Sequence, residues 1–330
     1  MNFSLLPQLP ERIDIEPTTK CNFRCVTCQR SYWNYKAKDM SLIQFEKILT
    51  NFPNLRKIKL QGIGEPLLNQ YFFEMVSMAK AKNIEVTTFT NASLFHLNGN
   101  LEKLQYCGID LLRISIDGGS KDIFEKTRQG SDFDQVVSNI RSLTSKRTSF
   151  LPTIEFWTVV TIENIYEIEK IITLAQSLNI KTVNVQFILN TFSYKKEIGN
   201  CLQKLSVQKQ PEILKEAVQK AYQKANQLGI NLVPQTSKSF SEDNPCHWPF
   251  DTAFINVEGY VVPCCTIADP RIINMGNLFS EPFSQIWKNQ RYQEFRTKIL
   301  SCDLIAACKN CYSQEHKKSI KIICNAQNCE

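Results

Sequence analysis

The chain has 330 residues, of which 43% are hydrophobic, and its formal net charge is +7. A chain of this length can bury a substantial core without stabilising crosslinks, so its 13 cysteines do not indicate a small disulfide scaffold. The modest basic charge is not gathered in a Lys- or Arg-rich block, which argues against nucleic acid as a partner.

The N-terminal segment lacks the basic start and the long apolar run of a secretory signal. No uninterrupted apolar run of about 18 residues occurs that would span a membrane. We therefore expect a cytoplasmic protein without a membrane partner. In that reducing compartment, clustered cysteines are more often metal ligands or catalysts than disulfides.

From residue 11 to about 235, short β-branched and apolar runs alternate with longer segments of helical period. Six such repeats predict parallel strands joined by right-handed crossovers, with functional groups at the C-terminal ends of the strands. The predicted fold class is α/β, with a partial (β/α)6 barrel of the TIM type. The expected strands are 12–17, 57–61, 85–90, 111–116, 153–160 and 182–189, and the expected helices are 41–51, 69–82, 97–107, 132–145, 165–178 and 211–228.

The pattern changes near residue 240, after one more short strand expected over 230–233. Cysteines then become frequent, and regular alternation is lost. One amphipathic helix is expected over 282–300. The predicted parts are an N-terminal lead over 1–10, the barrel over 11–235, and a small cysteine-rich α+β domain over 236–330.

Three cysteines, Cys21, Cys25 and Cys28, lie on one short loop directly after the first expected strand. Three thiolates can hold three irons of a [4Fe–4S] cluster and leave the fourth iron open to another ligand, whereas a purely electron-carrying cluster takes four cysteines. Zinc would prefer a fourth protein ligand, and none stands nearby in the sequence. The loop therefore predicts a cluster with an open iron, with a structural metal as the alternative.

This loop, KCNFRCVTC, resembles the signature of the radical S-adenosylmethionine (SAM) superfamily. In that family the methionine amine and carboxylate bind the open iron, and an electron from the cluster cleaves the sulfonium to give a 5′-deoxyadenosyl radical. The resemblance implies two cofactors, SAM and a SAM-binding [4Fe–4S] cluster. Thr27 departs from the family pattern, which commonly has an aromatic residue there, so packing near the adenosine is expected to be weaker.

The end of the second strand resembles the element of the family that meets the methionine amine, and the end of the third resembles a segment that lines the cofactor pocket. After the second strand, QGIGEPLLN carries Gly62, Gly64 and Glu65, which resemble the Gly-Gly-Glu element. Glycines there let backbone carbonyls approach a ligand closely. After the third strand, Thr90 and Asn91 resemble positions that line the cofactor pocket. Taken alone, each segment is equally compatible with a structural turn.

Two further strand ends resemble other parts of that pocket. RISIDGG places Ser115 and Asp117 on one face of the fourth strand, as groups that bind ribose hydroxyls require. Asn164, after the fifth strand, resembles another pocket position. The resemblance covers about residues 11–235.

The C-terminal part carries a second group of cysteines. Cys246 and Cys264 flank Gly259, and Cys308 and Cys311 have two residues between them. Four ligands in two separated pairs suit either an all-cysteine [4Fe–4S] cluster or zinc. The ordered segments CHWPF, DTAFINVEGYVVPCC, MGNLF, SQIW and CKNC resemble the SPASM extension of radical enzymes, which implies an auxiliary [4Fe–4S] cluster.

The number of auxiliary clusters is open. A full SPASM domain binds two clusters through seven cysteines, several of them in a compact run. Here twelve residues separate Cys311 from Cys324, and four more precede Cys329. We expect one auxiliary cluster, as in shortened "twitch" variants, and Cys302, Cys324 and Cys329 leave two clusters possible.

Cys265 directly follows an expected ligand and is a candidate catalytic residue. Its thiol could donate a hydrogen atom to a substrate radical, as in some radical epimerases. The competing interpretation is a buried small hydrophobic residue.

The resemblance implies an oxidoreductase-type radical enzyme, which abstracts a hydrogen atom from its substrate and passes an electron to the auxiliary cluster. Peptide-modifying relatives commonly carry a peptide-binding segment ahead of the barrel, whereas the first expected strand here begins near residue 11. We therefore expect a small or carrier-conjugated metabolite as the substrate. Maturation of a ribosomal peptide, by crosslinking or epimerisation, is the alternative. A non-catalytic electron carrier or metal-stabilised scaffold is the alternative from another class. A flavodoxin- or ferredoxin-type protein is the expected electron donor.

Overall fold

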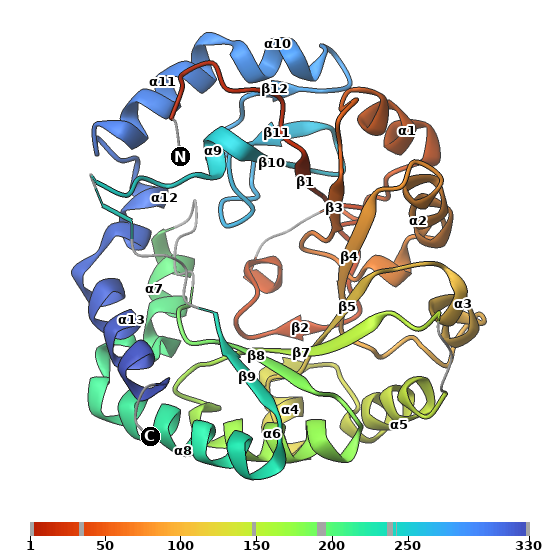
Figure 1. Ribbon diagram of the computed structural model, residues 1–330, viewed down its shortest axis with the longest axis vertical. Coiled ribbons are helices and arrows are strands. Elements are labelled where there is room, and N and C mark those ends of the chain that lie inside the picture. Colours follow the sequence, from red (N-terminus) through yellow and green to blue (C-terminus); the bar gives the residue numbers. More distant parts are fainter. Residues whose placement is uncertain are drawn as a thin grey trace.

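The computed structural model describes residues 3–32, 36–146, 150–189, 196–235, 240–241 and 243–327. One curved sheet runs in the order β12-β11-β10-β1-β3-β4-β5-β7-β8-β9, and helices cover its outer face (Figure 1). The strands of this sheet are β1 (Arg12–Ile15), β3 (Lys57–Leu60), β4 (Glu85–Thr90), β5 (Leu111–Ser115), β7 (Thr153–Val159), β8 (Thr182–Gln186), β9 (Asn231–Pro234), β10 (Thr252–Ile255), β11 (Tyr260–Val262) and β12 (Gly276–Asn277).

All neighbours from β10 across to β9 pair in parallel, as alternating strands and helices require. This confirms the predicted α/β class, and each expected strand is present with ends shifted by at most a few residues. The helices in this part of the chain are α1 (Leu42–Thr50), α2 (Phe72–Lys80), α3 (Asn100–Tyr106), α4 (Lys121–Thr127), α5 (Phe133–Thr144), α6 (Ile168–Ser177), α7 (Lys196–Leu205) and α8 (Pro211–Leu228).

The two faces of the sheet differ in chemistry. On β1, Ile13 and Ile15 are fully buried in the main hydrophobic core. The residue between them, Asp14, points to the other face, because successive side chains of a strand alternate. Lys59 and Arg113 occupy the same face on β3 and β5. The concave face of the sheet is therefore rich in charged groups.

The C-terminal part extends the barrel sheet. β10 pairs in parallel with β1, and β11 and β12 follow in antiparallel order. All four residues of β10 are buried, and the Thr252 hydroxyl donates to the Arg12 carbonyl at 3.0 Å. The sequence analysis did not identify β10, so it did not anticipate that the two parts share one sheet.

The single helix expected over 282–300 is wrong, because two helices lie there. These are α10 (Phe283–Lys288) and α11 (Gln290–Leu300). Asn289 between them is extended, with φ −69° and ψ 167°, and its side chain accepts the Tyr292 N–H. An extended residue with a side-chain acceptor begins a new helix and cannot continue the previous one.

Three further helices complete the C-terminal part: α9 (Trp248–Asp251), α12 (Ala306–Lys309) and α13 (Gln314–Gln327). α13 lies against α8 of the barrel (Figure 1). The N-terminal lead is held by the same part, since the Trp287 indole donates to the Gln8 carbonyl at 2.9 Å and Arg296 donates to the Leu5 carbonyl at 2.9 Å. No helix among the described residues is long and apolar enough to cross a membrane.

Candidate functional site

The cysteine loop follows β1 and is pinned at the C-terminal end of the sheet. Its residues Arg24–Cys25 form β2, which pairs antiparallel with β6 (Arg128–Gln129). Cys25 stands opposite Arg128, and the Val26 N–H donates to the Thr127 carbonyl at 2.9 Å. A segment about 100 residues further along the chain thus fixes the loop.

The three thiols of the loop, those of Cys21, Cys25 and Cys28, are half-buried and influence one another. Burial raises the pKa of Cys25 to about 12, and the charges of Cys28 and Cys21 add to that rise. Burial also raises the pKa of the other two thiols. Three half-buried thiols that influence one another fit a metal cluster, which binds thiolates and releases their protons.

Among the described residues, no group of three or more His, Cys, Asp and Glu side chains is arranged to hold a single metal ion.

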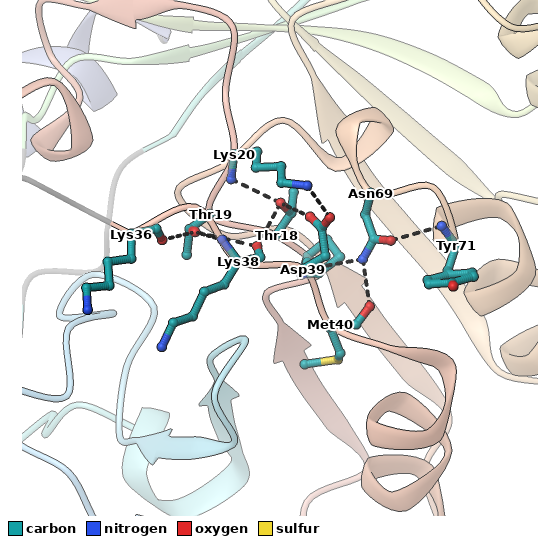
Figure 2. A network of polar contacts seen from close by, with 10 residues as sticks. Thr18, Thr19, Lys20, Lys36, Lys38, Asp39, Met40, Asn69 and Tyr71 are labelled. Carbon is teal, nitrogen blue, oxygen red and sulfur yellow. Dashed lines mark hydrogen bonds and ion pairs between the residues drawn. The ribbon is translucent and has the colours of Figure 1, made fainter.

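Polar contacts fix the chain just before Cys21, as Figure 2 shows. The Thr18 hydroxyl donates to the Asp39 carboxylate at 2.7 Å, and the Lys20 ammonium pairs with the same carboxylate. From the other side, the Asn69 amide donates to two backbone carbonyls at 2.8 and 2.9 Å. The cysteine loop therefore starts from a rigid base.

Both expected glycines after β3 are sites of close packing. A Cβ on Gly64 would lie 2.3 Å from the Thr18 carbonyl oxygen and 2.5 Å from that of Lys20. A Cβ on Gly62 would lie 2.2 Å from Cγ of Glu16. Only glycine lets this loop rest against the segment that leads into the cysteines.

The structure brings Glu65, Thr90 and Asn91 together. The Glu65 carboxyl group accepts the Thr90 hydroxyl at 2.7 Å and the Asn91 N–H at 2.8 Å. Burial raises the pKa of Glu65 to about 7. The Asn91 amide in turn donates to Asn22 of the cysteine loop at 3.0 Å. Glu65 thus ties two strand ends to the loop, and its own oxygens are engaged within the protein.

Asp117 and Asn164 are also engaged within the protein. One Asp117 oxygen accepts the Val159 N–H at 2.8 Å, and the other pairs with Arg128 at 2.7 Å. Asn164 donates to the Asp117 carbonyl at 2.9 Å. Ser115 ends β5 and is half-buried. Of these three expected contacts, the two buried ones brace the loops around the site.

Arg128 is the functional candidate that the sequence analysis missed. Its guanidinium lies 4.0 Å from the Cys25 sulfur and pairs with Asp117, and 9% of the side chain is exposed. A buried cation beside the thiols would favour their thiolate form and the negative charge of a cluster. No local pattern around Arg128 in the sequence indicates its partner.

The structure gathers the four expected auxiliary ligands around one apolar pocket. Cys246, Cys264, Cys308 and Cys311 line it together with aromatic side chains such as Trp248. Burial raises the pKa of Cys246 and of Cys308 to about 12. Four thiols in an apolar chamber fit an all-cysteine cluster.

The remaining cysteines of the C-terminal part are arranged differently. Cys265 is half-buried, and its hydrogen bond with Cys264 and its burial raise its pKa, while the Lys59 ammonium opposes that rise. Cys324 is exposed on α13, and Cys302 lies in the turn after α11. Cys329 lies outside the described residues.

Two family models match the chain. Residues 15–175 match the model of the radical SAM superfamily, and residues 246–312 match that of an iron–sulfur cluster-binding domain, SPASM. The chain is 24% identical over 321 residues to the tungsten-containing aldehyde ferredoxin oxidoreductase cofactor-modifying protein of Pyrococcus furiosus. The aligned region covers 90% of this chain and 86% of that protein. It is also 24% identical over 334 residues to the AdoMet-dependent heme synthase of Methanosarcina barkeri, covering 93% and 92%.

Solved structures share the fold. One is native anSMEcpe with bound AdoMet, with a TM-score of 0.70, 17% identity and coverage of 97% of this chain and 100% of that one. Another is Streptococcus suis SuiB bound to the precursor peptide SuiA, with a TM-score of 0.68, 16% identity and coverage of 88% and 67%.

Proposed function

Because the chain is a radical SAM superfamily enzyme with a SPASM domain, we propose that it abstracts a hydrogen atom from a small or carrier-conjugated metabolite and passes an electron to one auxiliary cluster. The barrel over 11–235 holds the SAM-binding cluster, and 236–330 holds the auxiliary one. The ligands of the SAM-binding cluster are Cys21, Cys25 and Cys28. Those of the auxiliary cluster are Cys246, Cys264, Cys308 and Cys311.

The observation that carries this proposal is the contrast between the two thiol groups. Three thiols on a single loop interact electrostatically with one another, and four line one apolar pocket. Three ligands leave an iron open to a reactant, and four saturate a cluster that exchanges only electrons. A non-catalytic electron carrier would have no use for the open position.

The chain's own residues build the reaction chamber around the bound SAM, which supplies the deoxyadenosyl radical when its cluster is reduced. Gly64 leaves room for the loop beside the thiols, and Glu65 holds two strand ends to that loop. Arg128 places a buried positive charge next to Cys25. These groups would orient the reactants and exclude water, and Ser115 would meet a ribose hydroxyl.

The concave face of the sheet offers groups for a polar substrate. Arg113 pairs with Glu155 at 2.9 Å, and Asn184 donates to the same carboxylate at 2.9 Å. The guanidinium also lies 5.0 Å from the centre of the Trp157 ring and 5.5 Å from that of Phe89. Charged, amide and aromatic groups together suit a molecule with both polar and planar parts.

The names of the sequence relatives support a small-molecule substrate, since one modifies a cofactor and one is a heme synthase. Peptide maturation is the second candidate, because a protein of the same fold is seen with a precursor peptide. A flavodoxin- or ferredoxin-type protein would supply the electron in either case. Cys265 is the candidate hydrogen-atom donor if the product is an epimer.

The first test is metal content. Iron, sulfide and zinc are measured with Mössbauer spectra on anaerobically reconstituted wild type and on a Cys21/Cys25/Cys28→Ala variant. We expect about eight irons to fall to about four, as two [4Fe–4S] clusters require, with loss of reductive SAM cleavage. Zinc with little iron, or SAM cleavage by the variant, would overturn the proposal.

The second test concerns the substrate class. The enzyme is incubated with SAM, reductant and size fractions of a deuterium-labelled cell extract, and deuterium in 5′-deoxyadenosine is measured by mass spectrometry. Transfer from the low-mass fraction supports a metabolite. Transfer from the peptide fraction alone would favour peptide maturation.

A further inference from the structure

A buried ion pair lies on the concave face of the sheet, apart from the cysteine loop. Asp14 of β1 and Lys59 of β3 are in register, and the Lys59 ammonium pairs with the Asp14 carboxylate. The Asp14 side chain is 0% exposed and that of Lys59 is 19% exposed. Burying two charges costs free energy that their attraction offsets only in part, so stability alone does not explain the pair.

The ammonium group of this pair lies beside the auxiliary site. Lys59 Nζ is 6.0 Å from the centre of the Trp248 ring, and Trp248 lines the pocket of the four thiols. Arg12 places a second cation 5.7 Å from the same ring. Both cations therefore lie beside a ring that also lines the cluster chamber.

The Lys59 ammonium is held by its ion pair with the Asp14 carboxylate. That carboxylate is itself fully buried and lies 3.9 Å from the Arg12 guanidinium. The cation is thus a fixed feature of the chamber's surroundings.

A fixed cation near an iron–sulfur cluster acts on its reduction potential. Reduction adds one negative charge to the cluster, and a nearby positive charge stabilises that state more than the oxidised one. Low dielectric and exclusion of water strengthen the effect. The opposite holds for a nearby carboxylate, which lowers the potential.

We propose that Lys59, held in place by Asp14, is a positioning residue of the barrel that raises the reduction potential of the auxiliary cluster. Lys59 lies outside the auxiliary domain, so the barrel itself would adjust the cluster as an electron acceptor. The inference rests on the proposed auxiliary cluster.

The test measures the midpoint potential of the auxiliary cluster by titration monitored by electron paramagnetic resonance (EPR). The full-length Cys21/Cys25/Cys28→Ala variant is the background, so that every iron signal comes from the auxiliary site. In that background we expect Lys59→Met to lower the potential. Lys59→Arg keeps the positive charge, so its potential should stay near the value measured with lysine. Asp14→Asn should raise it, because the lysine charge is then less compensated.

The matched control is Lys57→Met. Lys57 lies two residues earlier on the same strand, but its side chain is 58% exposed and pairs with Glu85 at 2.7 Å. We expect no change in the potential there. Absence of the iron signal in the background variant would refute the proposed auxiliary cluster itself. With the cluster present, an unchanged potential in Lys59→Met, or shifts of the same sign in Lys59→Met and Asp14→Asn, would overturn the inference. If Lys59→Met does not fold, the sign of the Asp14→Asn shift decides.

Discussion

The Arg128 guanidinium and the Asp117 carboxylate form an ion pair of 2.7 Å, with 9% and 3% of their side chains exposed. Removing one member of a buried pair leaves the other charge buried without compensation. We predict that Arg128→Met lowers the free energy of unfolding by about 3 to 5 kcal/mol. Urea denaturation of the iron-free protein at pH 7 measures this loss.

The control for this prediction is the double variant Asp117→Asn/Arg128→Met, which removes both charges and should lose clearly less stability than the single variant. An exposed pair gives the other limit. Lys220 and Glu216 are 53% and 58% exposed, so Lys220→Ala should lose far less stability than Arg128→Met. Equal losses in the single and double variants would show that Arg128 does not act through Asp117.

Gly64 supports a prediction about the cysteine loop. A methyl group there would lie 2.3 and 2.5 Å from two backbone oxygens just before Cys21, and backbone cannot move aside as a flexible side chain can. We expect Gly64→Ala to cost about 1 to 3 kcal/mol, as overpacking does. Displacement of the loop should also reduce its cluster, so iron after reconstitution should fall toward about four per chain.

Gly99→Ala is the matched control. Gly99 has φ +68° and nothing within 4 Å of an added Cβ, so only backbone strain of about 1 kcal/mol is expected. Iron content should stay at the wild-type value. If Gly64→Ala also binds the full complement of iron, the close approach of its loop does not position the cysteines.

Local patterns in the sequence predicted the strands and the cysteine loop well. Leu111–Ser115 shows why, since half-buried and fully buried residues alternate within five positions. The three cysteines of the loop were recognisable because three residues and then two residues separate them. Features of this kind need no information about distant parts of the chain.

Long-range pairing could not be predicted in this way. β10 is only four residues long, and its place beside β1 depends on a partner about 240 residues earlier. The contact between Arg128 and Cys25 likewise joins segments 103 residues apart. Asp117 was expected to face ribose, but its oxygens are engaged by Val159 and Arg128, a partnership that no local pattern reveals.

The auxiliary ligand set gives a prediction on cluster number. Cys308 lines the thiol pocket, whereas Cys324 is exposed on α13. In the Cys21/Cys25/Cys28→Ala background, Cys308→Ala should lose most of the remaining iron. Cys324→Ser should keep about four irons per chain. Loss of iron in Cys324→Ser would instead indicate a second auxiliary cluster that uses α13.

Glu16 gives a prediction on pH. Its carboxyl group accepts the Ile63 N–H at 3.0 Å and the Val257 N–H at 3.2 Å, and burial raises its pKa to about 7. The folded protein therefore binds a proton that the unfolded chain, with a glutamate pKa near 4.5, releases earlier. The stability from this proton is complete below about pH 4.5 and is lost as the pH rises through about 7, by roughly 3 kcal/mol in total.

Glu16→Gln removes this titrating group, so its free energy of unfolding should depend less on pH between about 5 and 8 than that of wild type. The measurement is urea denaturation of the iron-free protein at several pH values, since cluster binding would add its own pH dependence. The difference between variant and wild type should grow in favour of the variant as the pH rises, because the variant has no buried carboxylate to form. A constant difference across this range would mean that Glu16 stays ionised, held by its two backbone N–H donors.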